Sequence, residues 1–484
     1  MNERIGVADG TRLSGEDLTF WWADSPMQPT TMAMLMLFDR KPDPTRLRQA
    51  FARAIEAVPR LTERVVDAPL DLTLPHWQGD PTFDLDYHVR HHTLSGQRNI
   101  EELFREIAPT YETPFDRSRP LWEARVFDGL HGRAKSAMFF KLHHAVADGV
   151  GGNAIFAAMT DWERDPHDNP PTNGHLHSKG TWPQSTWLGE RLVDALRDRV
   201  ALELDHARSV AATVADVIQH PDRLSKAREA LASIVETARF SSQSPLHDYG
   251  RARHLTGCQL PFPAMREMRR QLGGSMIDVI LTIMARAIGK WHVHHGLRQV
   301  KELMTLVPVN LRKPEEWADK PHLGNVATGI LVALPIRMRD PLATYREIHK
   351  RMEAKKNDPA SQAAPMVAEM MSVLPRAFFS WASEATFGNI DFIVTNVPGI
   401  MVPRYLAGAE IVSAYPFAPV AVRSPVSVAL YGYRDHLFVG LTSDETAMPD
   451  VDRFKDMILA AFKELQAAVR NVASHSPTWR HKAE

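Results

Sequence analysis

The segment that most constrains how this chain folds is SAMFFKLHHAVADGVGGNAIFAAM, at residues 136–159. A mostly apolar run from Ala137 to Leu142 predicts a buried strand. The run ends at the pair His143–His144, and after Asp148–Gly149 apolar residues return at helical spacing. The order is therefore strand, turn and helix, with both histidines at the end of the strand.

Adjacent residues at the end of a strand point to opposite faces, so His143 and His144 are expected to have different environments. One imidazole can face a cleft while the other packs inward. An imidazole in a cleft suits general-base catalysis because its ordinary pKa lies near neutral pH. Asp148 is too close in sequence for the usual charge-relay carboxylate, so we expect it to brace the turn. Gly149 is expected to allow a turn conformation that is closed to other residues.

Other interpretations of this segment remain open. A single histidine is more often structural than catalytic. His144 and Asp148 could ligate a metal ion, although no histidine cluster in the chain has the HExxH or cysteine-paired spacing of a zinc site. Gly149, Gly151 and Ala154 fit a relaxed dinucleotide-binding fingerprint, but the acidic residue expected about 20 positions later falls in a proline-rich stretch. We therefore favour general-base chemistry without a metal.

Composition excludes several classes of protein. The chain has 57 Lys and Arg against 58 Asp and Glu, so it lacks the basic surplus with which proteins bind nucleic acid. Its one cysteine, Cys258, excludes an intrachain disulfide and fits a reducing compartment. No stretch approaches the run of about 20 apolar residues that spans a bilayer. The charged N-terminus does not resemble a signal peptide.

Predicted helices and strands occur on both sides of a long connector. We predict a mixed α/β architecture with two domains, at residues 1–164 and 251–484, joined by a linker and helical connector at residues 165–250. The expected helices lie at residues 44–58, 100–111 and 276–291. The expected strands lie at residues 32–38, 122–127, 137–142, 303–309, 327–334, 392–395, 426–431 and 437–441.

The motif HHxxxDG at residues 143–149, placed after an apolar strand, is the signature of acyltransferases that use CoA or carrier-protein thioesters. Further motifs follow the order of the bacterial wax ester synthase/diacylglycerol acyltransferase family, and the resemblance runs from about Leu13 to Leu465. These motifs are Leu13-Ser14-x-x-Asp17, Pro29-Thr30, FDLDYHV at residues 83–89, PFDRSRPLWE at 114–123, VPVNLR at 307–312, Gly324-Asn325 and TNVPG at 395–399.

The sequence departs from the family pattern at the start of the predicted helix 276–291. Members of the family carry an Asn-Asp pair there, whereas this chain has Ile277 and Asp278. An SPLN-like stretch shortly before it ends in His247. If the missing Asn positions a substrate or an oxyanion in relatives, the rate or the substrate preference of this protein will differ.

The resemblance implies a fold like that of chloramphenicol acetyltransferase, with two domains and an active-site tunnel between them. It implies that His144 is the general base, with His143 packed behind it. Asp148 and Gly149 are then expected to hold the catalytic loop.

The resemblance also implies the substrates. Acyl-CoA is expected as co-substrate, without a bound cofactor or metal, and diacylglycerol or a long-chain alcohol as the acceptor. The products are then triacylglycerol or wax esters. Candidate substrate-binding residues are Asn396, Trp122 and Asp278, although Trp122 is equally compatible with core packing.

With such substrates, we expect the protein to lie in the cytoplasm, bound peripherally to the inner face of the membrane or to lipid inclusions. The apolar residues 365–381 could contact such a surface or line an acyl channel, although a helix packed on the core explains them better. Two other functions remain open. One is a related transferase that acylates a polyketide or peptide alcohol from a carrier-protein thioester. The other is a lipid-surface binding protein with weakened catalysis.

Overall fold

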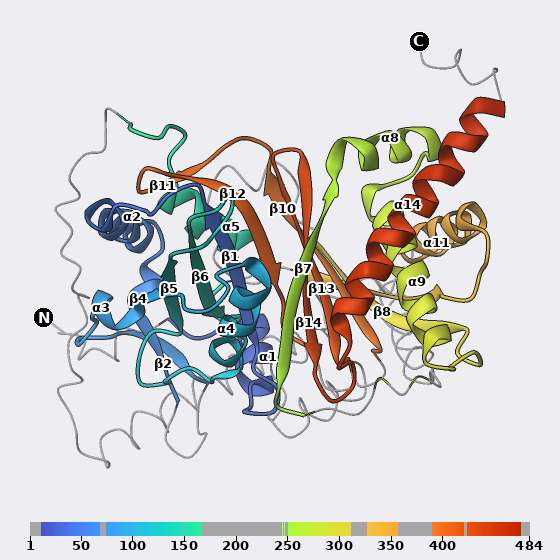
Figure 1. The fold of residues 1–484 in the computed structure, drawn as a ribbon. Coiled ribbons are helices and arrows are strands. Elements are labelled where there is room, and N and C mark those ends of the chain that lie inside the picture. Colours follow the sequence, from blue (N-terminus) through green and yellow to red (C-terminus); the bar gives the residue numbers. More distant parts are fainter. Residues whose placement is uncertain are drawn as a thin grey trace, which may run out of the picture.

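The computed structural model describes residues 11–67, 74–147, 149–166, 244, 246, 250–310, 327–356, 390–420 and 424–475. Within these residues, two six-stranded sheets stand side by side with helices packed around them (Figure 1). Each sheet contains both antiparallel and parallel neighbours, which confirms the mixed α/β fold in two parts. The apolar stretch at 365–381 and nearly all of the predicted connector at 165–250 lie outside the described residues.

The first sheet has the strand order β11-β12-β1-β6-β5-β4. Its strands are β1 (Thr31–Phe38), β4 (Val89–Thr93), β5 (Trp122–Asp128), β6 (Ser136–His143), β11 (Tyr405–Leu406) and β12 (Ala409–Phe417). The same half contains the hairpin of β2 (Glu63–Val66) and β3 (His76–Gly79), and helices α1 (Gly15–Ala23), α2 (Pro44–Ala57), α3 (Leu85–His88), α4 (Ile100–Glu112) and α5 (Gly149–Met159). β6 lies between β1 and β5, and every residue of β6 is buried.

The later part of the chain supplies two strands of this first sheet. β12 pairs antiparallel with β1, from Phe417 opposite Ala33 to Ile411 opposite Phe38, and Figure 1 shows β12 in orange beside β1 in blue. Neither half of the chain therefore completes the first sheet alone. The domain limits at 164 and 251 stay a prediction.

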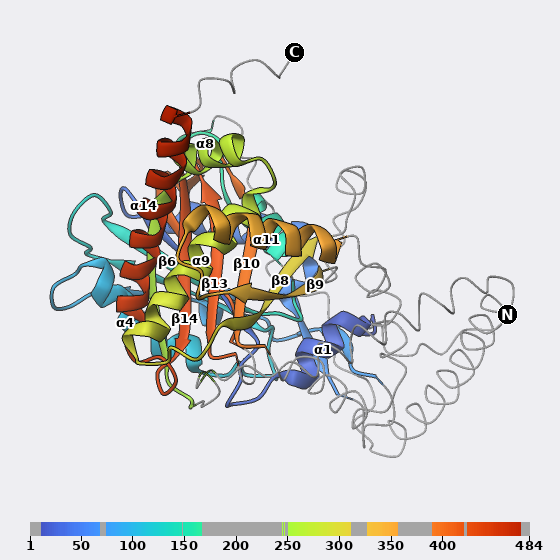
Figure 2. The ribbon, with the colours of Figure 1, turned by 90° about the vertical axis from the view of Figure 1, so that its right-hand side faces the viewer.

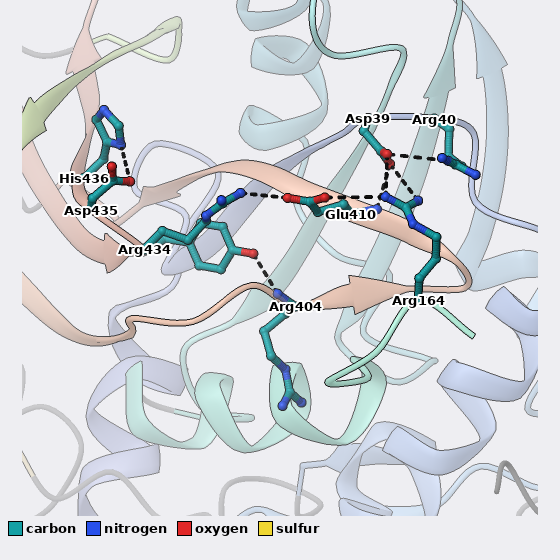
Figure 3. A network of polar contacts seen from close by, with 9 residues as sticks. Asp39, Arg40, Arg164, Arg404, Glu410, Arg434, Asp435 and His436 are labelled. Carbon is teal, nitrogen blue, oxygen red and sulfur yellow. Dashed lines mark hydrogen bonds and ion pairs between the residues drawn. The ribbon is translucent and has the colours of Figure 1, made fainter. Parts of the chain in front are cut away.

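Charged side chains tie the ends of β1 and β12 together (Figure 3). Arg164 donates to the carboxylates of Asp39 (2.8 Å) and Glu410 (3.4 Å). Arg434 donates to the other oxygen of Glu410 (2.7 Å). This network joins residues from both halves of the chain, although each partly exposed pair contributes only about 0–1 kcal/mol.

The second sheet has the order β7-β14-β13-β10-β8-β9. Its strands are β7 (Arg253–Pro261), β8 (Glu302–Asn310), β9 (Ala327–Pro335), β10 (Phe392–Ile400), β13 (Val426–Tyr433) and β14 (His436–Asp444). The helices of this half are α8 (Phe262–Leu272), α9 (Met276–His294), α11 (Pro341–Lys356) and α14 (Val451–His475). Figure 2 shows α9, α11 and α14 over the outer face of the sheet, where their apolar residues form a second core.

Helix α9 begins at Met276 because a capping box forms there. Ser275 Oγ accepts the Asp278 N–H (3.4 Å), and Asp278 Oδ2 accepts the Ser275 N–H (2.8 Å). Among the described residues, no single helix is long and apolar enough to cross a membrane. In the described part of the chain, α8 and α9 reach that length and composition only when taken together, and they are bent by 104°.

Candidate active site

The histidine pair lies where β6 ends, and the residues that begin β1 hold it. The pairing of β1 with β6 places Thr31 opposite His143. The His144 N–H donates to the Thr30 carbonyl oxygen (2.8 Å). The Val146 N–H donates back to the His143 carbonyl oxygen (2.9 Å), so the chain turns directly after the pair and then enters α5.

His143 is buried, and both of its ring nitrogens have partners. Its Nδ1 accepts the N–H of Ala145 (3.0 Å), because a backbone N–H can only donate. In the neutral imidazole the ring proton is therefore on Nε2, which faces Thr30 Oγ1 (3.0 Å) and the carboxylate of Asp24 (3.7 Å). This environment makes His143 an orienting residue rather than a base that meets substrate.

Asp24 follows the last residue of α1 and completes this network. Its Oδ1 accepts the Thr30 N–H (2.9 Å), and its Oδ2 accepts an Arg117 guanidinium N–H (2.9 Å). Burial alone raises the pKa of Asp24, but the neighbouring His143 and the hydrogen bonds from Thr30 and Arg117 outweigh burial and lower this pKa to about 2. Asp24 is therefore ionised at neutral pH and fixes the loop that precedes β1.

His144 has a different environment from its neighbour. It is half-buried, and its ring is stacked on Phe20 of α1, with ring centroids 3.7 Å apart and planes inclined by 14°. A half-buried imidazole at the end of a strand can reach a substrate as a general base. The two histidines thus differ in exposure as the alternation of a strand predicts, while the catalytic role of His144 stays a prediction.

Gly149 is the first residue of α5. We expected a glycine there because of a special turn conformation, but the structure shows another reason. Gly149 has no left-handed backbone conformation. A Cβ atom at this position would lie 3.0 Å from Val397 Cγ2 on β10. The glycine therefore permits close approach of the second half of the chain, and the expectation of a special turn conformation was wrong. Asp148 lies outside the described residues.

The TNVPG segment lies on β10, next to the first turns of α5. The Asn153 side chain donates to the Pro398 carbonyl oxygen (2.6 Å), directly beyond the contact between Gly149 and Val397. Asn396 lies one residue before Val397, opposite Leu430 of β13, and its side chain is exposed. Its role in substrate binding stays a prediction.

Trp122 and Asp278, the other candidate substrate-binding residues, have structural partners. Trp122 is buried, donates from Nε1 to the Leu61 carbonyl oxygen (2.7 Å) and stacks on His88 with ring centroids 4.6 Å apart. This geometry favours the core-packing interpretation of Trp122. Asp278 is buried in the capping box of α9 and also faces His349 Nδ1 (3.0 Å). We therefore interpret both residues as parts of the framework.

A buried lysine lies two residues before His143 on β6. Lys141 Nζ donates to the carbonyl oxygens of Thr110 (2.7 Å) and Thr113 (2.6 Å) at the end of α4, and lies 3.4 Å from Glu123. Burial lowers the pKa of Lys141 to about 8, although Glu123 opposes the shift. Lys141 is the one charged residue of the apolar run 137–142, and this lone charge is the sequence signal that points to such a contact.

Phe20 and Asp24 were not predicted as neighbours of the histidine pair. Thr30 and Arg117 were named only as parts of motifs, without a role. All four lie on loops or on α1, far in sequence from the histidines, so spacing alone did not connect them. Among the described residues, no group of three or more His, Cys, Asp or Glu side chains is placed to hold a metal ion.

Two family models match the chain. One is described as the wax ester synthase/diacylglycerol acyltransferase catalytic domain and matches residues 13–280. The other is described as the WS/DGAT C-terminal domain and matches residues 323–466. A Mycobacterium tuberculosis protein named "Putative diacyglycerol O-acyltransferase" is 30% identical over 481 residues, covering 96% of this chain and 92% of the relative. Another from the same species, named "Probable diacyglycerol O-acyltransferase", is 26% identical over 440 residues, with 90% of each chain covered.

Solved structures show the same fold. A wax ester synthase/diacylglycerol acyltransferase from Marinobacter aquaeolei VT8 matches with a TM-score of 0.64 and 21% identity, over 95% of this chain and all 100% of that chain. The first condensation domain of the calcium-dependent antibiotic synthetase matches with a TM-score of 0.61 and 14% identity, over 96% and 97% of the two chains. At these identities the likeness concerns the fold.

Proposed function

Because the chain belongs to the wax ester synthase/diacylglycerol acyltransferase family, we propose that it transfers a fatty acyl group from acyl-CoA to diacylglycerol or a long-chain alcohol, with His144 as general base. The observation that supports this role is the contrast within the histidine pair. His143 is buried with both ring nitrogens engaged, whereas His144 is half-buried at the end of β6.

The reaction needs one proton to move twice. His144 takes the proton of the acceptor hydroxyl as its oxygen attacks the thioester carbonyl carbon. The tetrahedral intermediate then collapses, the carbon–sulfur bond breaks, and the imidazolium returns the proton to the leaving CoA thiolate. The products are an ester and free CoA, so no redox partner is required. General-base catalysis of this kind contributes about 10²–10⁴-fold to the rate.

The acceptor is tested by the release of free thiol. Purified protein is incubated with palmitoyl-CoA and either dipalmitoylglycerol or hexadecanol, and the CoA thiol is followed with a thiol reagent. Cys258 adds little background because burial raises the pKa of its thiol to about 12. We expect thiol release with at least one acceptor and a matching ester product. Thiol release with neither acceptor contradicts the proposed function and favours a lipid-surface binding protein.

We also propose that the protein works at a lipid surface on the cytoplasmic side of the membrane or on lipid inclusions. Apolar side chains support this proposal: Trp162 is 69% exposed, Met401 38% and Val402 42%. Asp161 forms a β-bridge with Tyr405, which brings the segments carrying these side chains next to each other. Indole rings favour the interface between lipid and water.

Flotation with phosphatidylcholine vesicles that contain diacylglycerol tests this placement. We expect the wild-type protein to float with the vesicles and a Trp162→Ala, Val402→Ser variant to float less. Wild-type protein that remains at the bottom of the gradient contradicts the lipid-surface proposal and leaves the acyltransferase reaction untouched.

A further inference from the structure

The imidazole of His144 lies against the aromatic ring of Phe20, which has no role in the proposed acyl transfer so far. Phe20 of α1 covers one face of this imidazole, at 3.7 Å between ring centroids and 14° between planes. We propose that Phe20 is a positioning residue that holds the His144 ring face-on and stabilises its protonated form. This inference rests on the proposed role of His144 as general base.

The stack fixes the orientation of the base. The His144 N–H donates a hydrogen bond to the Thr30 carbonyl oxygen (2.8 Å), which fixes the backbone from which the imidazole extends. A rotation of the imidazole out of the plane parallel to Phe20 forfeits the ring contact. Backbone and ring contacts together therefore limit the directions in which the imidazole nitrogens can point, which is the geometric requirement for proton transfer.

The stack also distinguishes the two protonation states of His144. The face of a benzene ring carries partial negative charge and attracts a cation within about 6 Å of its centroid. The neutral imidazole has no net charge, whereas the imidazolium formed in the transition state does. An interaction that is stronger in the transition state than in the ground state lowers the barrier. Phe20 therefore favours the state that the reaction passes through.

Helix α1 is anchored so that Phe20 stays in place. The Phe20 carbonyl oxygen accepts the Thr30 hydroxyl (3.2 Å), which also contacts His143. The next residue, Trp21, donates from its indole nitrogen to Asp67 (2.9 Å), and the Arg117 guanidinium lies 4.0 Å from the centroid of the Trp21 ring. These contacts fix the end of α1 beside the histidine pair.

Charged groups around the histidine pair have partners other than the Phe20 ring. Asp24 and Arg117 pair with each other beyond His143. Lys141 on β6 faces Glu123 on β5. If replacement of Phe20 changes the titration of His144, the change is therefore due to the loss of the aromatic ring and not to the loss of an ion pair.

The test is an NMR titration of His144 in the full-length protein without substrate, with its signals assigned by their loss in His144→Ala. Phe20→Leu keeps the apolar cover and removes the ring. We expect His144 to titrate about 0.5 pH unit lower in this variant, and kcat to fall severalfold with KM unchanged. Phe20→Tyr keeps the ring and is expected to titrate as the wild-type protein does.

Phe115→Leu is the matched control, because the Phe115 ring meets His143 edge-on at 6.1 Å. It is expected to leave the His144 titration unchanged. An unshifted titration in Phe20→Leu, or an equal shift in Phe115→Leu, overturns the proposal. Should Phe20→Leu not fold, the wild-type spectrum decides: the Phe20 ring current must move the His144 ring protons upfield, and unshifted signals overturn the stack. Neither the titration nor the ring-current shift needs turnover, so a failure of the proposed acyl transfer remains distinguishable from a failure of this inference.

Discussion

The neighbouring residues His143 and His144 have the same side chain but make different contacts. His143 is held on both ring nitrogens, while His144 has one face on Phe20 and is half-buried. Thr30 contacts both histidines, with its hydroxyl on His143 and its carbonyl oxygen on the backbone of His144. Asp24 in turn holds the N–H of Thr30. The residues that orient the pair therefore precede β1.

Thr30→Val tests this orientation, because valine keeps the shape of threonine and removes its hydroxyl. We expect kcat to fall about tenfold, the equivalent of about 1.4 kcal/mol, since His143 loses a buried partner. KM should change little. Thr31→Val is the matched control, because Thr31 Oγ1 is buried and has no hydrogen-bond partner in the described part of the chain. Equal losses of kcat in the two variants would contradict the assignment.

Asp24 makes the stability of this region depend on pH. The folded protein lowers the pKa of Asp24 from 3.8 to about 2, so its contribution is complete above pH 4 and disappears as the pH falls to about 2. We expect Asp24→Asn to reduce the free energy of unfolding at pH 7 by about 2 kcal/mol. Chemical denaturation at pH 7 and pH 3 measures the difference, which should narrow at the lower pH. A constant difference contradicts the account.

At the scale of elements, several apolar strands and helices lie close to where the sequence predicts them. The strand predicted at 137–142 is β6, and the helix predicted at 276–291 is α9. β4 was missed because its sequence, VRHHT, is polar and its side chains are mostly exposed at the edge of the sheet. An exposed edge strand of this kind offers no apolar periodicity from which to predict it.

The contact between α5 and β10 can be tested at Gly149. We expect Gly149→Ala to cost about 1–3 kcal/mol of unfolding free energy and to reduce kcat/KM, because its Cβ atom crowds Val397. Adding Val397→Ala should restore both quantities. Gly152→Ala is the matched control, since nothing lies within 4 Å of a Cβ atom there. It should stabilise α5 by about 0.5–1 kcal/mol. Equal destabilisation by Gly149→Ala and Gly152→Ala would disprove the close approach.

At the scale of the whole molecule, chain order and spatial order differ. Two α/β parts could be predicted from the helices and strands on each side of the connector. The strand β12 was not predicted, and its place in the first sheet follows from its pairing with β1 rather than from a pattern in its own residues. The stack of Phe20 on His144 could not be predicted for the same reason. Both contacts join residues that are far apart in the chain, and the spacing of residues in one sequence does not show which distant segments meet.

The crossing of β12 predicts how fragments behave. A fragment of residues 1–164 lacks β11 and β12, so β1 presents an unpaired edge. We expect this fragment to aggregate, and co-expression with residues 251–484 to recover soluble protein. Size-exclusion chromatography and circular dichroism measure the outcome. A monomeric fragment that unfolds cooperatively would show that the first sheet is independent of β12.

The measurement that tests the central claim most directly is the rate of CoA release by His144→Ala. The substrates are palmitoyl-CoA and the acceptor that the wild-type protein prefers, and circular dichroism verifies the fold of each variant. We predict a loss of about 10²–10⁴-fold in kcat, with no loss in His91→Ala, which removes an exposed histidine of β4. A folded His144→Ala variant that releases CoA at the wild-type rate would contradict the assignment of His144 as the base.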